Sequence, residues 1–118
     1  MDRPTPSVFD VVRLAVEVCD PDDVDPVLGR LEEQFEDADE PVTTVENLEE
    51  RLAIALEGAD YEGEAPAVSV ASAVVLYLAA HPAEVGSHPD PTGLIERAVA
   101  AQWHRTPPQD VADWVAGR

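Results

Sequence analysis

Apolar and polar positions divide the chain into helix-length segments that are separated by proline and glycine. From Ser7 onward, polar residues recur at steps of three and four, and this spacing predicts an amphipathic helix over residues 7–19. Asp10 stands three residues after Ser7, an arrangement typical of a capping box at a helix start. The apolar stripe of this helix consists of Val8, Val12, Ala15 and Cys19.

Two further one-sided stripes follow the turn expected at residues 20–23. Asp25 and Pro26 provide an N-cap and a proline for the first helical position of a second helix, which must end before Pro41. Residues 43–46 predict the cap of a third helix, which ends at Gly58. The stripe of the second helix is Val24, Leu28, Leu31, Phe35 and Ala38. The stripe of the third is Val45, Leu48, Leu52, Ala55 or Leu56, and Ala59.

The segment from residue 65 to residue 83 carries no formal charge, and its apolar residues cover every face of a helix. Such a helix could cross a membrane or form the centre of a bundle. Pro66 and Pro82 limit its length, two serines interrupt it, and acidic rather than basic residues flank it. The sequence therefore predicts a central buried helix over residues 66–81.

The last third contains two more helix starts after a loop expected at residues 81–89. Asp90 and Pro91 open a fifth helix, and Thr106 with Gln109 forms the pattern of a second capping box before a short sixth helix that Gly117 closes. No segment has the alternation typical of a strand. We therefore expect an all-α fold, a single domain over residues 1–118 with five or six helices around residues 66–81.

Charge is distributed very unevenly along this chain. Its 25 Asp and Glu face 7 basic residues, all Arg, which gives a formal charge of -18. Residues 1–64 (the acidic half) hold 20 carboxylates and 4 Arg, whereas residues 65–118 (the near-neutral half) hold 5 and 3. This balance argues against a basic nucleic-acid binder and against a basic membrane-surface helix. Like charges at helical spacing, such as Glu32 with Glu36, each oppose helix formation by about 0.2–0.5 kcal/mol in dilute salt.

A chain with this charge needs concentrated salt or bound cations, because salt screens the repulsion between carboxylates. The chain has no Lys, 17 Val, 17 Ala, two Ile and two Phe. In this composition it resembles small cytoplasmic proteins of halophilic archaea, and the resemblance implies a cytoplasm at high salt. Residues 1–6 have no apolar stretch typical of a signal peptide, which also favours the cytoplasm. The alternative is an acidic protein from a GC-rich organism that lives at ordinary salt.

Histidines and carboxylates near residue 81 suggest one possible metal site. If the loop folds back, His81 and His88 could approach each other, with Glu84 or Asp90 as a third ligand for zinc or iron. No spacing places two histidines on one helical face, and His81 is also explained by contacts with the last carbonyls of its helix. The acidic run at residues 20–25 fails the pattern of a calcium loop, so only weak, nonspecific cation association is expected there.

Positive charge and tryptophan gather near the C-terminus, and this is the main hint of a binding surface. The candidate partner-binding residues are Arg97, Trp103, His104, Arg105 and Trp114. The alternative is that the two tryptophans pack together and cap the core.

The leading hypothesis is a non-enzymatic helical module, without cofactor or catalytic residues, that acts by protein–protein contact or self-association at high salt. A metal-dependent enzyme or metal sensor using His81 and His88 is the first alternative. A nucleic-acid-associated regulator using Arg97 and Arg105 is the second.

Overall fold

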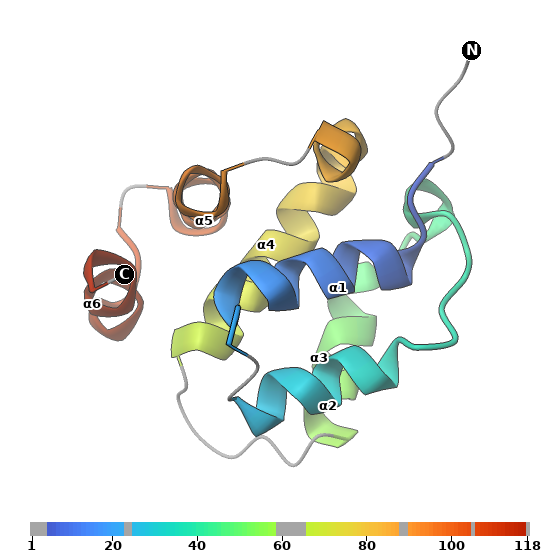
Figure 1. Ribbon diagram of the computed structural model, residues 1–118, viewed down its shortest axis with the longest axis horizontal. Helices are drawn as coiled ribbons and strands as arrows, with labels where there is room; N and C mark the ends of the chain where they lie inside the picture. The colour runs from blue at the N-terminus through green and yellow to red at the C-terminus, as the bar shows by residue number, and fades with distance from the viewer. Residues whose placement is uncertain (1–4, 23–24, 59–65, 88–89, 105, 118) are drawn as a thin grey trace.

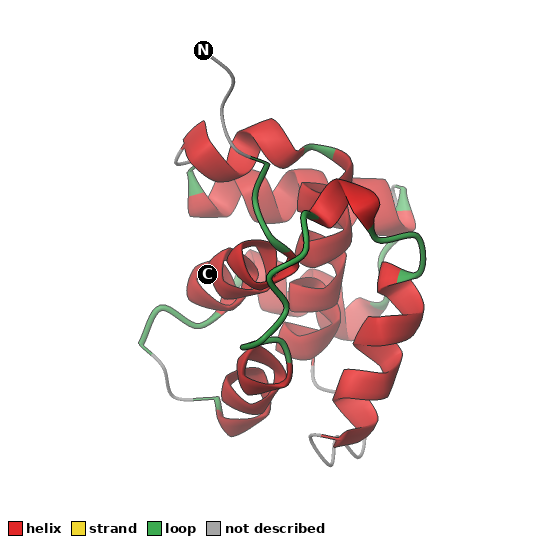
Figure 2. Ribbon diagram, turned by 90° about the vertical axis from the view of Figure 1, so that its right-hand side faces the viewer, coloured by secondary structure: helices red, strands yellow, loops and turns green. Residues whose placement is uncertain are grey.

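The computed structural model describes residues 5–22, 25–58, 66–87, 90–104 and 106–117. Within these ranges the protein is all-α, as predicted, and no strand is formed (Figure 2). The α-helices, shown in Figure 1, are α1 (Val8–Cys19), α2 (Pro26–Gln34), α3 (Leu48–Gly58), α4 (Pro66–Ala80), α5 (Pro91–Trp103) and α6 (Gln109–Ala116). Two 3-10 helices, η1 (Val42–Thr44) and η2 (Pro82–Ser87), lie between them.

Helix α4 forms the centre of the bundle, which confirms the prediction for the uncharged segment. It packs against the other five α-helices and both 3-10 helices. In Figure 1, α5 and α6 lie on one side of α4, and α2 and α3 lie on the other. The side chains of Val70, Val74, Val75 and Leu78 are fully buried. Along the described ranges, no helix is long and apolar enough to span a bilayer.

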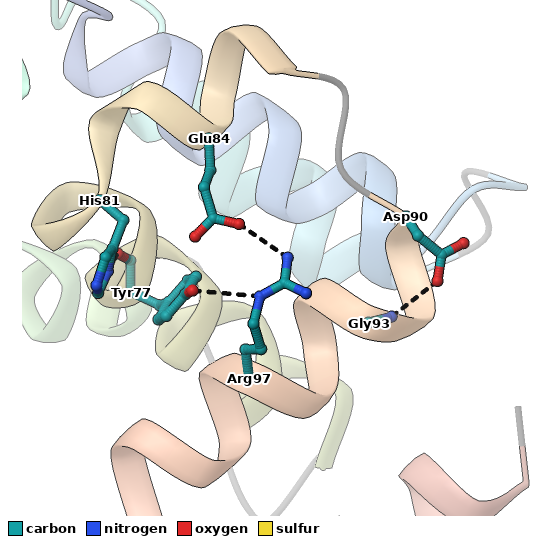
Figure 3. Close-up of polar contacts among 6 residues, drawn as sticks. All are labelled: Tyr77, His81, Glu84, Asp90, Gly93 and Arg97. Atoms are coloured by element: carbon teal, nitrogen blue, oxygen red, sulfur yellow. Dashed lines mark hydrogen bonds and ion pairs between the residues drawn. The ribbon is translucent and has the colours of Figure 1, made fainter.

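Three helix starts follow the local signals in the sequence. The Ser7 hydroxyl accepts a hydrogen bond from the Asp10 N–H, and the Asp10 carboxylate accepts one from the Ser7 N–H, so the capping box is formed. The carboxylate of Asp25 caps α2, and that of Asp90 caps α5 by accepting from the N–H of Gly93 (Figure 3). These capping side chains satisfy N–H groups that have no partner within the helix.

The second helix is shorter than predicted, because α2 ends at Gln34 and turns replace its expected last turn. Phe35 and Ala38 are nevertheless buried. Backbone carbonyls after α2 accept hydrogen bonds from the first N–H groups of α1. The Ala38 carbonyl accepts from the Phe9 N–H at 3.1 Å, and the Glu40 carbonyl accepts from the Val8 N–H at 3.0 Å. The segment after α2 is therefore bonded to the N-terminus of α1 instead of continuing as a helix.

The predicted start of the third helix is wrong, because α3 begins at Leu48 rather than at residues 43–46. The Val42 N–H donates to the Pro6 carbonyl, and the Thr44 hydroxyl donates to the Pro41 carbonyl. These bonds hold Val42–Thr44 as a 3-10 turn against the N-terminal segment. Val24 and residue 59, which the predicted stripes included, lie outside the described residues.

Two expectations about the last third are also corrected. Residues Pro82–Ser87 form a 3-10 helix instead of an irregular loop. The second capping box is not formed, since the Thr106 hydroxyl donates to the Trp103 carbonyl and Pro108 is the N-cap. Two consecutive prolines favour extended backbone, and Pro108 has a ψ of 151°, so helix α6 starts only at Gln109.

Candidate functional site

The uneven charge of the sequence becomes a separation of charge in space. Glu33 on α2 and Glu49 and Glu50 on α3 are exposed, as are Asp10 and Glu17 on α1. Helix α4 carries no charged residue, and α5 carries one Glu and one Arg. Because α2 and α3 lie on the other side of α4 from α5 and α6, the molecule has a strongly acidic side and a weakly charged one (Figure 1).

A polar network joins α4, η2 and α5 on the weakly charged side (Figure 3). The Arg97 Nε donates to the Tyr77 hydroxyl at 3.2 Å, and the Arg97 Nη2 forms an ion pair with the Glu84 Oε1 at 2.8 Å. A single guanidinium therefore links a side chain near the end of α4 to one on η2.

The network shifts the titration of its members. A hydrogen bond with the Tyr77 hydroxyl lowers the pKa of Glu84 below its usual value and outweighs the opposite effect of burial. The Arg97 guanidinium lowers this pKa further. The same hydrogen bond with Glu84 raises the pKa of the Tyr77 hydroxyl. The hydrogen bond with Tyr77 raises the pKa of Arg97 further. At neutral pH, Glu84 is therefore ionised, Arg97 is protonated and the Tyr77 hydroxyl is neutral.

His81 lies directly beside this network. Its ring stacks on that of Tyr77, with centroids 4.4 Å apart and an interplanar angle of 26°. The His81 Nδ1 lies 3.0 Å from the Tyr77 carbonyl oxygen, and this oxygen can only accept a hydrogen bond. Nδ1 therefore carries a proton, and in the neutral ring Nε2 is left as an acceptor.

A groove of about 190 Å³ runs between α4 and α5 next to the two rings. We call it the α4–α5 groove. Its lining is Ala73, Leu76, Tyr77, Ala80, His81, Ala98, Ala101 and Gln102. Not one of these side chains is an Asp, Glu or Arg, although the chain has a formal charge of -18. The groove is thus an uncharged site on an acidic protein.

The described members of the predicted partner-binding set lie on α5, directly after α5, or on α6. Arg97 belongs to the network, while Trp103 and Trp114 are half-buried and pack against the core. His104 is exposed and has a φ of 57°, an uncommon conformation for a residue other than glycine. Arg105 lies outside the described residues, so the nucleic-acid hypothesis that uses it stays a prediction.

The predicted metal ligands have separate structural roles where they are described. Glu84 pairs with Arg97, Asp90 caps α5, and His81 bonds to a backbone carbonyl. Among the described residues, no group of three His, Cys, Asp or Glu is arranged to hold a metal ion. His88 lies outside these residues, so the metal hypothesis stays a prediction.

The acidic run after α1 also has a structural explanation. Asp20 is buried, and its carboxylate accepts a hydrogen bond from the Asp25 N–H at 2.9 Å. Asp25 in turn caps α2 through the N–H groups of Val27 and Leu28. These two carboxylates hold the connection between α1 and α2. A cleft of about 420 Å³ between these helices has Glu17, Glu32, Glu33 and Glu36 among its lining residues.

Sequence reasoning missed Tyr77 as a functional candidate. The available signal was its spacing of four residues from His81, which places both rings on one face of the fourth helix. Arg97 stands 20 residues away along the chain, and no local pattern relates it to Tyr77.

Comparison of the chain with protein-family models, with curated proteins and with solved structures finds no significant match.

Proposed function

We propose that this protein is a small non-enzymatic helical module that works by protein–protein contact through its weakly charged side. The contact surface consists of the α4–α5 groove and the adjoining parts of α5 and α6. The observation that carries the proposal is the uncharged lining of this groove on a protein with a formal charge of -18. A protein surface that must dehydrate on binding favours uncharged residues at its centre.

Aromatic and arginine residues on α4, α5 and α6 support this assignment. Trp103 and Trp114 are half-buried and pack against the core without being fully enclosed by it. Trp, Tyr and Arg are enriched at the energetically important positions of interfaces. Tyr77 and Arg97 are held in place by the network, which lowers the entropy that they would lose on binding.

The environment of this contact is a concentrated salt solution in the cytoplasm. The composition of the chain supports this setting, since the acidic half would repel itself in dilute buffer. At about 1 M salt the screening length falls to about 3 Å, which weakens repulsion between exposed carboxylates. Apolar contacts persist under these conditions, whereas contacts between exposed charges weaken.

Site-specific photo-crosslinking in the cells that contain the protein tests the proposal. A benzophenone amino acid replaces Ala101, which is exposed in the α4–α5 groove, or Ala53, which is exposed on α3. We expect a discrete protein adduct from position 101 and none from position 53. The adduct from position 101 should disappear when Ala80→Glu adds a charge to the opposite wall. Adducts from position 53 alone, or from neither position, would contradict the proposal.

A further inference from the structure

We infer that the partner at the α4–α5 groove is a different protein that inserts one aromatic side chain with a hydrogen-bond donor, carried on a basic segment. This inference rests on the proposed function and names the chemistry of the partner. Tryptophan and tyrosine are the side chains that combine a ring with such a donor.

The size of the groove matches a single side chain. Its volume is about 190 Å³, whereas pockets for drug-sized molecules measure about 300–1,000 Å³. Ala73 and Ala98 are buried and form its floor, while Ala80 and Ala101 are exposed at its rim. A protruding side chain can fill such a hollow, whereas a flat surface laid over it would leave a void and lose contacts.

The α4 wall of the groove favours an aromatic ring. The rings of Tyr77 and His81 are stacked with their centroids 4.4 Å apart, and both residues line the groove. Aromatic side chains pack well on other rings in offset or edge-to-face arrangements. The hydrogen bond from Arg97 holds Tyr77 in place, so this wall is formed before a partner arrives.

Hydrogen-bonding groups in the lining favour a ring with a donor. The Nε2 of neutral His81 is an acceptor, because its Nδ1 donates to the Tyr77 carbonyl. An indole N–H or a phenol O–H can donate to this nitrogen, and the side-chain amide of Gln102 can bond to the backbone of the partner. Phenylalanine has no donor and would leave Nε2 without a hydrogen bond once water is displaced.

Charge determines the residues that flank the inserted ring. Among the residues that line the groove there is no Asp, Glu or Arg, so a charged side chain inside it would lose water without gaining an opposite charge. The chain as a whole carries a formal charge of -18, which attracts basic segments and repels acidic ones. The complementary segment is therefore basic around an uncharged aromatic residue.

NMR titration of the 15N-labelled chain with short capped peptides tests the inference. The probe is acetyl-Lys-Trp-Lys-amide in about 0.5 M KCl, which limits nonspecific attraction to the acidic half. We expect shifts of the amide signals of Ala80, His81 and Ala101, and a Kd of about 1 mM, since one side chain makes most of the contact. The peptide with 1-methyltryptophan lacks the indole N–H and should bind about two- to tenfold more weakly. Peptides with Leu in place of Trp, or Glu in place of Lys, should also bind more weakly.

Three variants of the chain localise the binding. Ala101→Leu fills part of the groove and should raise the Kd about tenfold or more. Ala53→Leu makes the same change at an exposed position of α3 and should leave the Kd unchanged. His81→Phe keeps a ring but removes Nε2, so the tryptophan and 1-methyltryptophan peptides should bind to it equally. Circular dichroism verifies that all three variants fold.

Several outcomes would overturn the inference. These are no binding of the tryptophan peptide up to about 10 mM, shifts confined to α2 and α3, or a Kd that Ala101→Leu leaves unchanged. Equal affinity of the unchanged chain for the Leu, Glu or 1-methyltryptophan peptide would also overturn it. If any of these results accompanies a protein adduct from position 101, the aromatic anchor is rejected and the proposed function stands. If position 101 gives no adduct either, both are rejected.

Discussion

Arg97 on α5 donates from its Nε to the hydroxyl of Tyr77 on α4, with 3.2 Å between the two atoms. The bond joins residues 20 positions apart, and the same guanidinium reaches Glu84 on η2. Three consecutive elements are therefore connected at the surface through one side chain (Figure 3). The position of α5 against α4, and with it the shape of the α4–α5 groove, depends in part on these contacts.

The network should make a pH-dependent contribution to stability. The folded-state pKa of Glu84 is below its ordinary value of 4.5, so its contribution is fully present above about pH 4.5. It is lost as the pH falls through the lowered pKa, because the unfolded chain then binds the proton more readily. We expect Glu84→Gln to cost about 1 kcal/mol or less at pH 7, since the carboxylate is partly solvated.

Urea unfolding at a series of pH values measures this effect. The difference in unfolding free energy between the unchanged chain and Glu84→Gln should shrink as the pH is lowered below 4.5. Glu49→Gln removes an exposed carboxylate from α3 and serves as the control for the loss of one negative charge. A difference that grows toward low pH would contradict the role of the Arg97 network.

Stability should rise with salt. The acidic half holds 20 carboxylates and 4 Arg, and screening reduces the repulsion among them. Helicity and Tm are measured from about 0.05 to 3 M KCl, a range over which the screening length becomes very short. Replacing KCl by sucrose separates charge screening from a general effect of cosolute on burial. A Tm that is constant or falls with KCl would show that the acidic composition is not an adaptation to salt.

The centre of α4 should not tolerate a charge. Val74 is fully buried, so Val74→Asp places a carboxylate where no water or basic partner can reach it. The cost of several kcal/mol is comparable to the whole stability of about 5–15 kcal/mol expected for a domain, and we expect the variant to be unfolded. Ala53→Asp, at an exposed position of α3, is the matched control and should fold. Retained helicity in Val74→Asp, or fast hydrogen exchange along Pro66–Ala80 in the unchanged chain, would place α4 at the periphery.

Trp103 should matter more for association than for folding. Its ring is half-buried at the end of α5, where it packs against the edge of the core. We expect Trp103→Ala to weaken self-association of the chain about tenfold, as is typical of an interface tryptophan, with a much smaller effect on Tm than Val74→Asp. Sedimentation equilibrium and thermal melting are measured on the same samples, with Trp103→Phe as the variant that keeps an aromatic ring. A large fall in Tm with association intact would assign Trp103 to the core.

Helix starts were predictable where a capping signal acts over three or four residues. Ser7 with Asp10, Asp25 with Pro26, and Asp90 with Pro91 each open a helix at the expected place. The side chain that caps is a near neighbour of the N–H groups that need an acceptor, so little information from the rest of the fold is required. The Thr106 signal failed because two prolines intervene before Gln109 and delay the helix.

The sequence by itself also determined which helix is central. A helix that is apolar on every face must be covered on every side, and α4 packs against all the others. Only the tertiary structure decided where α2 ends and α3 begins, because the segment between them is bonded to the N-terminal part of the chain. The carbonyls of Ala38 and Glu40 accept from the start of α1, and the Val42 N–H donates to the Pro6 carbonyl. It also decided that Arg97 meets Tyr77 and that an uncharged groove forms between α4 and α5. These contacts join segments that are distant in sequence. The physical reason is that packing, rather than the local sequence, decides which groups become hydrogen-bond partners of polar side chains and of the backbone groups at helix ends.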